Sequence, residues 1–559
     1  MKKAWVLLTF LTIQLPLYTY SQGGVWTWMG GDTTINSLGH FGTKGVSSIY
    51  NHPPALYESG EWSDKMGNFW LLGGLNYPGT YYIGNTLWRL NPVTLEWTWM
   101  SGDTTTNQHG VYGTIGVPDS NNHPASKGYG MITWVDTSGN LWLYGGFTYG
   151  IGYYNSNDMW KYDISSNLWT WLGGSISNVQ PTYGILGVPS LTNNPGSRGE
   201  CAASWTDKDN NLWFFGGETN NDLWKYSIAT GEWTWMSGSD TVLDGGDYGI
   251  KFISSSSNRP PARSCYSAIV DTNSNLILFG GGVYNFLTTG FNDVWKFDLS
   301  TNEWTWIGGN NSANDSTFII NSCVFDSQNS PAARYENRGK VRDSLGRLWS
   351  FGGFQHQSWY DTYEDMWVFD PNINMWALAA GPTGINGQPV YGWLGIADSS
   401  NHVGCRAGAA VWQNVNDGSI WVYGGNGRRG NGNVYLADLW KFTPDYTCFT
   451  IDSLATGLNN DSIEDQFSYN VFPNPTNQII NIQLSLKLPA FVTIELYDVL
   501  GNKLQQIVNG NQEQGEHNAT IDAHKLSNGV YVLQIRAGEQ VVRRTPDSFG
   551  AEQKIVVMH

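Results

Sequence analysis

Six copies of one pattern limit the folds that this chain can adopt. In each copy an apolar run ends in a double glycine, and a second run with a central tryptophan follows. The double glycines begin at Gly73, Gly145, Gly216, Gly280, Gly352 and Gly424, and the second runs begin at Leu87, Met159, Leu223, Val294, Met366 and Leu439. Short aromatic and β-branched runs between Gly, Asn and Asp clusters are typical of antiparallel strands. The pattern predicts an all-β repeat protein.

A third run, of the WTW type, follows the first five copies at Trp97, Trp169, Trp233, Trp304 and, degraded, Trp376. After the sixth copy it is missing, but VWTWMGGD stands near the start of the chain, from Val25 to Asp32. We expect this N-terminal strand to complete the last sheet, because closure removes an unpaired sheet edge. The paired tryptophans recur in register, so we assign them to packing.

The double glycine, the DxWxYD-type run and the Trp-bearing run together resemble the kelch repeat. The resemblance implies a six-bladed kelch-type β-propeller over residues 22–446, with residues 22–32 as the closing strand of the last blade. The copies recur about every 70 residues, against roughly 50 for a kelch repeat. The excess lies in insertions before each first strand, such as VYGTIGVP at Val111 and TYGILGVP at Thr182. Their recurrence favours a structural role.

Composition and the chain start indicate export. The formal net charge of −17 disfavours nucleic acid as a partner, since nucleic-acid binders usually carry a basic surface. Residues 1–21, with Lys2 and Lys3 before an apolar run, predict a signal peptide cleaved near Ser21. No later apolar stretch is long enough for a transmembrane helix. The five cysteines permit up to two disulfides, whose pairing the sequence leaves open.

Strand alternation places the loops after the double glycines and the insertions on one face. The loops differ most among the copies, and long varied loops on a rigid scaffold often carry function. Exposed aromatic and basic side chains there suit sugars or protein partners, although they could equally pack the insertions onto the sheets. The candidate binding residues are Tyr81, Tyr82, Tyr153, Tyr154, Tyr284, His356, Trp359, Tyr360, Arg428 and Arg429.

We assign the charged residues that recur in the repeat to a structural role, because residues that recur in every copy are more often structural than catalytic. Aspartates precede the second-run tryptophans and basic residues precede the first strands, so we expect buried turn bonds or ion pairs between blades. His52, His123 and His402 lie in different copies without carboxylate or Cys at ligand spacing. Galactose oxidase-like kelch enzymes would need a Tyr-His pair that this chain lacks. We therefore expect no metal site, no catalytic residue and no cofactor.

The chain after the repeats has its own organisation. Residues 447–466 form a polar, acidic linker, and residues 467–559 alternate in a way that predicts a small C-terminal β-sandwich. The ordered segments VFPNPT, VTIELYDVLGNKL, LSNGVYVLQI and KIVV resemble the C-terminal sorting domain of type IX secretion cargo in Bacteroidota. The motif residues are Pro473, Asn474, Pro475, Asp498, Gly501, Gly529, Tyr531 and Lys554. The resemblance implies handling by the type IX secretion machinery and secretion or attachment at the outer-membrane surface.

We therefore interpret the chain as an exported, monomeric binding module for carbohydrate or another extracellular polymer. Two alternatives stay open: a carbohydrate-active enzyme, either an oxidase or a lyase, on the same loops, and an adhesin that binds protein. The sequence does not identify the ligand.

Overall fold

The computed structural model describes residues 23–76, 82–150, 152–264, 266–283, 289–337, 341–356, 358, 360–382, 384–429, 432–451, 467–473, 476, 478–487, 489–498, 503–527, 529–538 and 549–557. Two compact units divide at Ile451 and Asp452. We expected the linker to begin at residue 447, but a short 3-10 helix (Tyr446–Cys448) and β34 (Thr450–Ile451) belong to the first unit.

The described part of the first unit contains six antiparallel sheets of four or five strands. We number them in chain order. Sheet one contains β2 (Gly60–Ser63), β3 (Phe69–Leu72), β4 (Leu87–Asn91) and β5 (Glu96–Ser101). Sheet two contains β6 (Ile132–Val135), β7 (Leu141–Tyr144), β10 (Met159–Asp163) and β11 (Leu168–Gly173). Sheet three contains β12 (Ala203–Thr206), β13 (Asn211–Phe215), β14 (Leu223–Ser227) and β15 (Glu232–Ser237). 

Sheet four contains β16 (Ser267–Val270), β17 (Leu276–Phe279), β18 (Val294–Asp298) and β19 (Glu303–Gly308). Sheet five contains β22 (Val341–Arg342), β23 (Leu348–Phe351), β25 (Met366–Asp370) and β26 (Met375–Ala380). Sheet six contains β29 (Ala410–Gln413), β30 (Ile420–Tyr423), β33 (Ala437–Pro444), β1 (Gly24–Asp32) and β27 (Ala397–Asp398).

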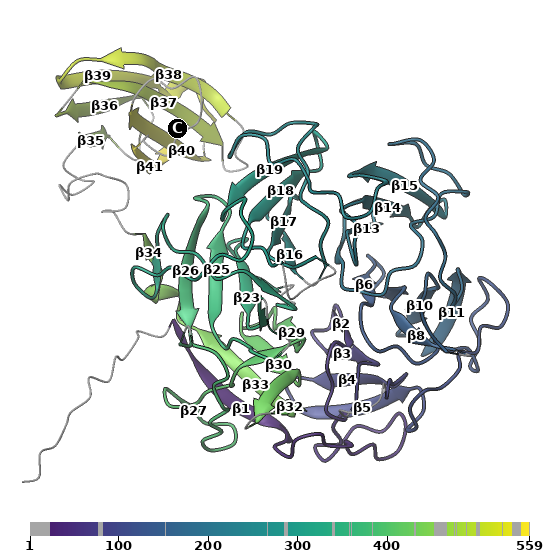
Figure 1. The fold of residues 1–559 in the computed structure, drawn as a ribbon. Helices are drawn as coiled ribbons and strands as arrows, with labels where there is room; N and C mark the ends of the chain where they lie inside the picture. Colours follow the sequence, from purple (N-terminus) through teal and green to yellow (C-terminus); the bar gives the residue numbers. More distant parts are fainter. Residues whose placement is uncertain are drawn as a thin grey trace, which may run out of the picture. The chain divides into compact units, whose positions relative to one another are not determined.

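The first strands of the six sheets form a closed ring. Each contacts the next, in the order β2, β6, β12, β16, β22 and β29, and β29 contacts β2 again. Hydroxyl groups link neighbouring strands in this ring: Thr133 Oγ1 donates to the Glu61 carbonyl at 3.0 Å, and Ser204 Oγ donates to the Thr133 carbonyl at 2.8 Å. Figure 1 shows the sheets following one another around this ring. The all-β fold is propeller-like.

The N-terminal strand β1 lies in sheet six, where it pairs with β33 from Gly24 opposite Pro444 to Asp32 opposite Ala437. An asparagine in each insertion marks the same place in every sheet, because its side-chain amide donates to a carbonyl of the outer, WTW-type strand. The pairs are Asn51 to Trp97, Asn122 to Trp169, Asn193 to Trp233, Asn258 to Trp304, Asn329 to Trp376 and Asn401 to Trp26. The sixth pair reaches Trp26 in β1, so β1 occupies the outer-strand position.

The insertions cover the outer edges of the sheets. Ser48, Asp119, Ser190 and Ser255 bridge to the WTW-type strands of sheets one to four, and β27 pairs with β1 in sheet six. A recurring geometry anchors the YG segments: Tyr112, for example, donates to Asp158 Oδ2 at 3.0 Å and packs on Trp160 with ring centroids 5.0 Å apart. The extra length of the repeat thus protects an edge that would otherwise be open to other strands.

Five buried ion pairs tie neighbouring sheets together. Lys127 shows how: its backbone carbonyl accepts from Gly74 of sheet one, and its ammonium group lies 2.8 Å from Asp158 of sheet two. Equivalent pairs are Arg198 with Asp222, Arg263 with Asp293, Arg334 with Asp365, and Arg406 with Asp438. The expected buried ion pairs are present, but both partners of each pair belong to one copy of the repeat, and it is the backbone of the cation that contacts the preceding sheet. In each case the aspartate also accepts from the tryptophan two residues later.

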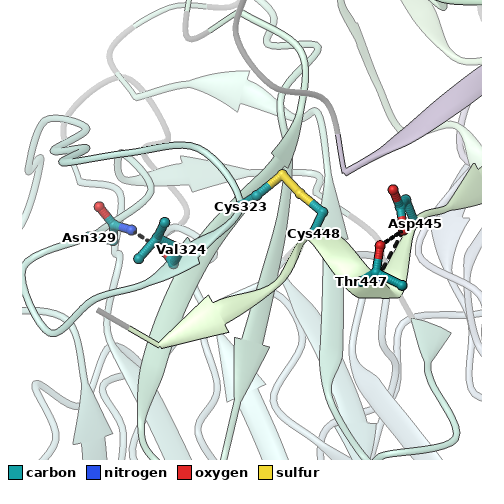
Figure 2. Close-up of a disulfide and its surroundings, with 6 residues drawn as sticks. All are labelled: Cys323, Val324, Asn329, Asp445, Thr447 and Cys448. Carbon is teal, nitrogen blue, oxygen red and sulfur yellow. Dashed lines mark hydrogen bonds between the residues drawn. A yellow bond between two sulfur atoms is a disulfide. The ribbon is translucent and has the colours of Figure 1, made fainter. Parts of the chain in front are cut away.

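A disulfide holds the end of the first unit. Cys323 of the fifth insertion is bonded to Cys448, which follows β33 by four residues (Figure 2). Beside it β20 (Val324–Phe325) pairs in parallel with β34, and Phe449 packs on Phe325 with centroids 5.9 Å apart. Among the described residues, this is one of the up to two disulfides that the sequence permits. Cys405 is a buried free thiol, Cys201 is buried, and Cys265 lies outside the described residues.

The described part of the second unit contains two sheets. One contains β35 (Phe467–Phe472), β36 (Ile479–Leu486) and β39 (Gly515–Asp522); the other contains β37 (Ala490–Asp498), β38 (Lys503–Gln512), β40 (Gly529–Gly538) and β41 (Phe549–Val557). Alternating side chains from both sheets, including Ile482, Leu496 and Leu533, share one buried cluster. A 3-10 helix (Ala523–Lys525) follows β39.

The sorting-motif residues fall on ends and cores of these strands. Pro473 follows β35, Asp498 ends β37, Gly529 begins β40 and Lys554 lies in β41. Tyr531 is buried and its hydroxyl donates to the Ser527 carbonyl at 2.8 Å. Asn474, Pro475 and Gly501 lie outside the described residues.

Candidate functional site

One face of the first unit carries both the insertions and the loops after the double glycines, and we call it the loop face. The end of the sixth insertion, β28 (Arg406–Ala407), pairs with the post-glycine hairpin of β31 (Asn426–Arg429) and β32 (Gly432–Tyr435). In sheet five, β21 (Arg334–Tyr335) pairs with β24 (Phe354–Gln355) in the same way. The glycines permit this crossing in sheet six, since Gly424 and Gly425 have φ of 65° and 99°.

The predicted binding residues of sheet two pack on their own loop. Tyr153 in β9 (Tyr153–Asn155) stacks on Phe147 of β8 (Phe147–Tyr149) at 5.5 Å, and Phe147 stacks on Tyr129 at 4.5 Å. Tyr154 pairs with Thr148 and is partly buried. Tyr153 keeps an edge exposed, but most of this aromatic surface supports the hairpin.

The other predicted residues that the structure describes are spread over the loops of sheets one, five and six. Tyr82 and Tyr360 are exposed, and the His356 ring lies 3.2 Å from the Ala333 carbonyl. Arg429 is in β31, paired with Gly432. Tyr81, Tyr284 and Trp359 lie outside the described residues.

Arg428 is the predicted residue that reaches a cavity. Its Nη1 lies 2.7 Å from Asp361 Oδ1 of the preceding sheet's loop, so the cation is paired and links sheets five and six. Hydrogen bonds from Asn386 and Ser358 and the nearby Arg428 guanidinium hold the pKa of Asp361 below its ordinary value. The cavity, of about 500 Å³, is lined by Thr33, Ile35, Gln388, Pro389, Tyr391, Cys405, Gly427, Arg428, Val434 and Leu436. We call it the loop-face cavity.

Titratable groups lie at and behind the wall of this cavity. Cys405, which lines it, accepts from the Gly387 N–H at 2.8 Å. Glu364 precedes β25 by two residues, and its Oε1 lies 3.9 Å from His402 Nδ1. Burial and the neighbouring Asp365 raise the pKa of Glu364 to about 7, while Arg406 opposes the shift. Burial also raises the pKa of the Cys405 thiol. Glu364 was not among the predicted residues, although a Glu at a position where other copies have Asn was a visible signal.

A second asymmetric cluster lies where segments from non-neighbouring sheets meet near the ring axis. Tyr57 of sheet one donates to Glu336 of sheet five, and Cys201 of sheet three donates to Glu58 of sheet one at 3.3 Å. Glu58 and Glu336 occupy the same position of the repeat, both are buried, and both have positive φ, of 56° and 55°. These carboxylates were not among the predicted residues, because single glutamates in non-repeating loops carry no motif.

The ring also encloses a cavity of about 350 Å³ beside the first strands. Thr133, Ser204 and Thr206 line it, and each donates its hydroxyl hydrogen to a carbonyl of the neighbouring first strand. Arg342 lines it as well and donates to the Val270 carbonyl at 3.2 Å. These polar groups serve the ring itself, so we consider the loop-face cavity the better candidate site.

The histidines considered for metal binding lie in separate insertions. His52 bridges to His40, His123 to Val111 and His402 to Val390. Within the described residues, no group of three or more His, Cys, Asp or Glu side chains could hold a metal ion. The described chain also contains no helix that is long and apolar enough to cross a membrane.

Residues 470–545 match the family described as secretion system C-terminal sorting domain. The match covers most of the described second unit and supports the interpretation of the chain as a type IX secretion substrate, secreted or attached at the cell surface. No curated protein matches the chain.

Solved structures resemble the chain only distantly. YjhT is 13% identical over 70% of this chain and 96% of its own, with a TM-score of 0.41. A Penicillium chrysogenum alpha-L-arabinanase complexed with arabinobiose is 10% identical over 69% of this chain and 93% of its own, with a TM-score of 0.36. PorZ, a surface component of the type IX secretion system of Porphyromonas gingivalis, is 14% identical over 92% of this chain and 52% of its own, with a TM-score of 0.28.

Proposed function

We propose that this protein is an exported binding module. Residues 22–446 form a six-bladed kelch-type propeller whose last blade is completed by residues 22–32. Residues 467–559 form a β-sandwich sorting domain, read by the type IX secretion machinery after signal cleavage near Ser21. The closed contact ring of first strands, the six Asn-to-Trp bonds and the two sheets of the second unit support this architecture.

The proposed ligand is carbohydrate or another extracellular polymer, bound on the loop face at the loop-face cavity. One observation carries the proposal: at this cavity the β31–β32 hairpin, which is one of the loops that differ most among the copies, meets the sixth insertion and the segment after β1. A concave site with apolar walls and few polar groups is the usual form of a ligand site. The Arg428 and Asp361 pair offers planar hydrogen-bonding groups at its edge, and such groups suit hydroxyl-rich ligands.

A glycan array probed with the full chain tests this proposal. We expect binding to a restricted set of glycans, weakened at least ten-fold by Arg428→Ala. Lys441→Ala is the matched control, because Lys441 forms an ion pair with Asp417 at 2.8 Å and does not line the cavity. A blank array together with binding to matrix or host proteins would replace carbohydrate by protein as the ligand and support an adhesin.

The enzyme alternative has one specific observation in its favour. A buried carboxyl with a raised pKa beside a cavity is a common feature of acid and base catalysts, and Glu364 has these properties. Turnover of any array-positive glycan, abolished by Glu364→Gln without loss of binding, would favour the enzyme over the binding module.

A further inference from the structure

Glu364 occupies a position that is asparagine in sheets one to four. The side chains of Asn85, Asn157, Asn221 and Asn292 each accept, through Oδ1, a hydrogen bond from the backbone N–H of the residue after a turn glycine. The donors are Asp103 at 2.9 Å, Ser175 at 2.9 Å, Ser239 at 3.0 Å and Asn310 at 3.2 Å. In sheets one to four the asparagine thus provides an acceptor for a backbone N–H of the turn.

Sheet five has Pro382 at the donor position. Proline has no backbone N–H, so the acceptor that asparagine supplies elsewhere is not needed here. A longer, titratable side chain can therefore replace asparagine without leaving that turn unsatisfied.

The Glu364 carboxyl fills its place tightly. The side chain is 5% exposed, and its Oε2 has no hydrogen-bond partner among the described atoms. The same oxygen lies against Gly387, where an added Cβ would approach it to 2.9 Å. Gly387 directly precedes Gln388 and Pro389, two residues that line the loop-face cavity. The carboxyl thus supports the wall of the cavity from behind.

The charged and titratable groups that face Glu364 come from two segments. Asp365 follows it on its own strand and is paired with Arg334, while Arg406 and His402 come from the sixth insertion, together with Cys405. Arg406 is itself bonded to Asp438 at 2.8 Å. His402 is charged only when protonated. An ionised Glu364 would therefore lie buried beside another carboxylate, with its nearest cations committed elsewhere or titratable.

We infer that Glu364 is a proton-dependent latch on the wall of the loop-face cavity. When protonated, the carboxyl stays buried and holds the segment around Gly387 in place. When it ionises, it gains solvation only by displacing that segment, so the wall opens more often. The raised pKa places this change near neutral pH. The role as a control of ligand access rests on the proposed function, but the latch itself does not.

Hydrogen exchange of the peptide covering 384–391 tests the latch without any ligand. With a pKa of about 7 in the closed state and 4.5 in the open state, linkage of one proton predicts about ten-fold more opening at pH 8 than at pH 6, after correction for intrinsic exchange. In Glu364→Gln the ratio should fall to about one. Glu364→Asn, which copies the other sheets, should behave like Glu364→Gln and covers the case in which the first variant folds poorly.

Glu218→Gln is the matched control. Glu218 is half-buried and burial raises its pKa, but it lies in the post-glycine loop of sheet three and accepts from the Gly199 N–H at 3.0 Å. Its substitution should leave the ten-fold ratio in 384–391 intact. A ratio near one in the wild-type chain, or a ten-fold ratio that persists in both Glu364 variants, would overturn the latch. A blank glycan array would overturn the proposed ligand and leave this result unaffected.

Discussion

Sheets one and five depart from the repeat in opposite ways. In sheet one, Leu56 stands where other sheets have a buried cation, Thr86 replaces the paired aspartate, and Phe41 replaces the tyrosine that donates to it. Phe41 instead packs on Trp88 with centroids 5.0 Å apart. Sheet five keeps its ion pair between Arg334 and Asp365 but places a titratable carboxyl at the neighbouring asparagine position.

The difference separates a structural departure from a functional one. Replacing a buried ion pair by apolar groups is often neutral for stability when all partners change together. In sheet one they do, and within the described residues the only trace is a Trp88 indole N–H without a partner. In sheet five a single change leaves a buried group whose charge depends on pH. Selection for stability alone would favour asparagine or glutamine there.

Breaking the ion pair of sheet five should produce the largest loss of stability. Arg334→Ala leaves Asp365 buried without its cation, so we expect the free energy of unfolding to fall by about 3–5 kcal/mol. Urea unfolding at pH 7 measures it. The double variant Arg334→Leu with Asp365→Thr copies sheet one and should lose clearly less. If the single and double variants lose the same free energy of unfolding, the residues that replace the ion pair in sheet one do not stabilise sheet five.

The converse change places an unpaired charge in sheet one. Thr86→Asp supplies the acceptor that the Trp88 N–H lacks, but no cation faces it, because Leu56 replaces the arginine. We expect a loss of about 3 kcal/mol in the same unfolding experiment, since a buried unpaired carboxylate is strongly unfavourable. Adding Leu56→Arg should recover most of it. If Thr86→Asp alone leaves the free energy of unfolding unchanged, the absence of charged groups at this position does not contribute to the stability of sheet one.

Glu364 should make the stability of the wild-type chain depend on pH. Its folded-state pKa of about 7 lies above the ordinary 4.5, so the folded state binds the proton more tightly, and stability falls as pH rises from 4.5 to 7. Glu364→Gln should therefore be neutral near pH 4.5 and raise the free energy of unfolding at pH 8 by up to ~3 kcal/mol. Unfolding curves at both pH values measure the difference. A variant that is equally stabilised at both would point to packing rather than ionisation.

The repeat could be predicted from sequence because its glycines and tryptophans have the same structural role in all six copies, and its aspartates have the same role in five of them. The partner of β1 followed from counting WTW runs, and the five ion pairs followed from recurring basic residues and aspartates. The site was harder to predict. Tyr153 looked like a binding residue but stacks on Phe147, since an exposed loop aromatic and a packed one have the same sequence signal. The role of Glu364 depends on Pro382, which removes the N–H donor of the turn, and on Gly387, against which the carboxyl lies. These residues are separated in sequence, and only the fold brings them together.

Arg428 provides the smallest expected effect on stability and the sharpest contrast with Arg334. Both arginines pair with an aspartate of sheet five or its loop, but the pair of Arg428 and Asp361 is partly exposed whereas that of Arg334 is fully buried. Arg428→Ala should therefore change the free energy of unfolding by less than about 1 kcal/mol. Lys441→Ala, which removes another exposed pair, should have a similarly small effect. A loss of several kcal/mol for Arg428→Ala would show that this arginine belongs to the framework, and the loop-face cavity would then lose the one predicted binding residue that reaches it.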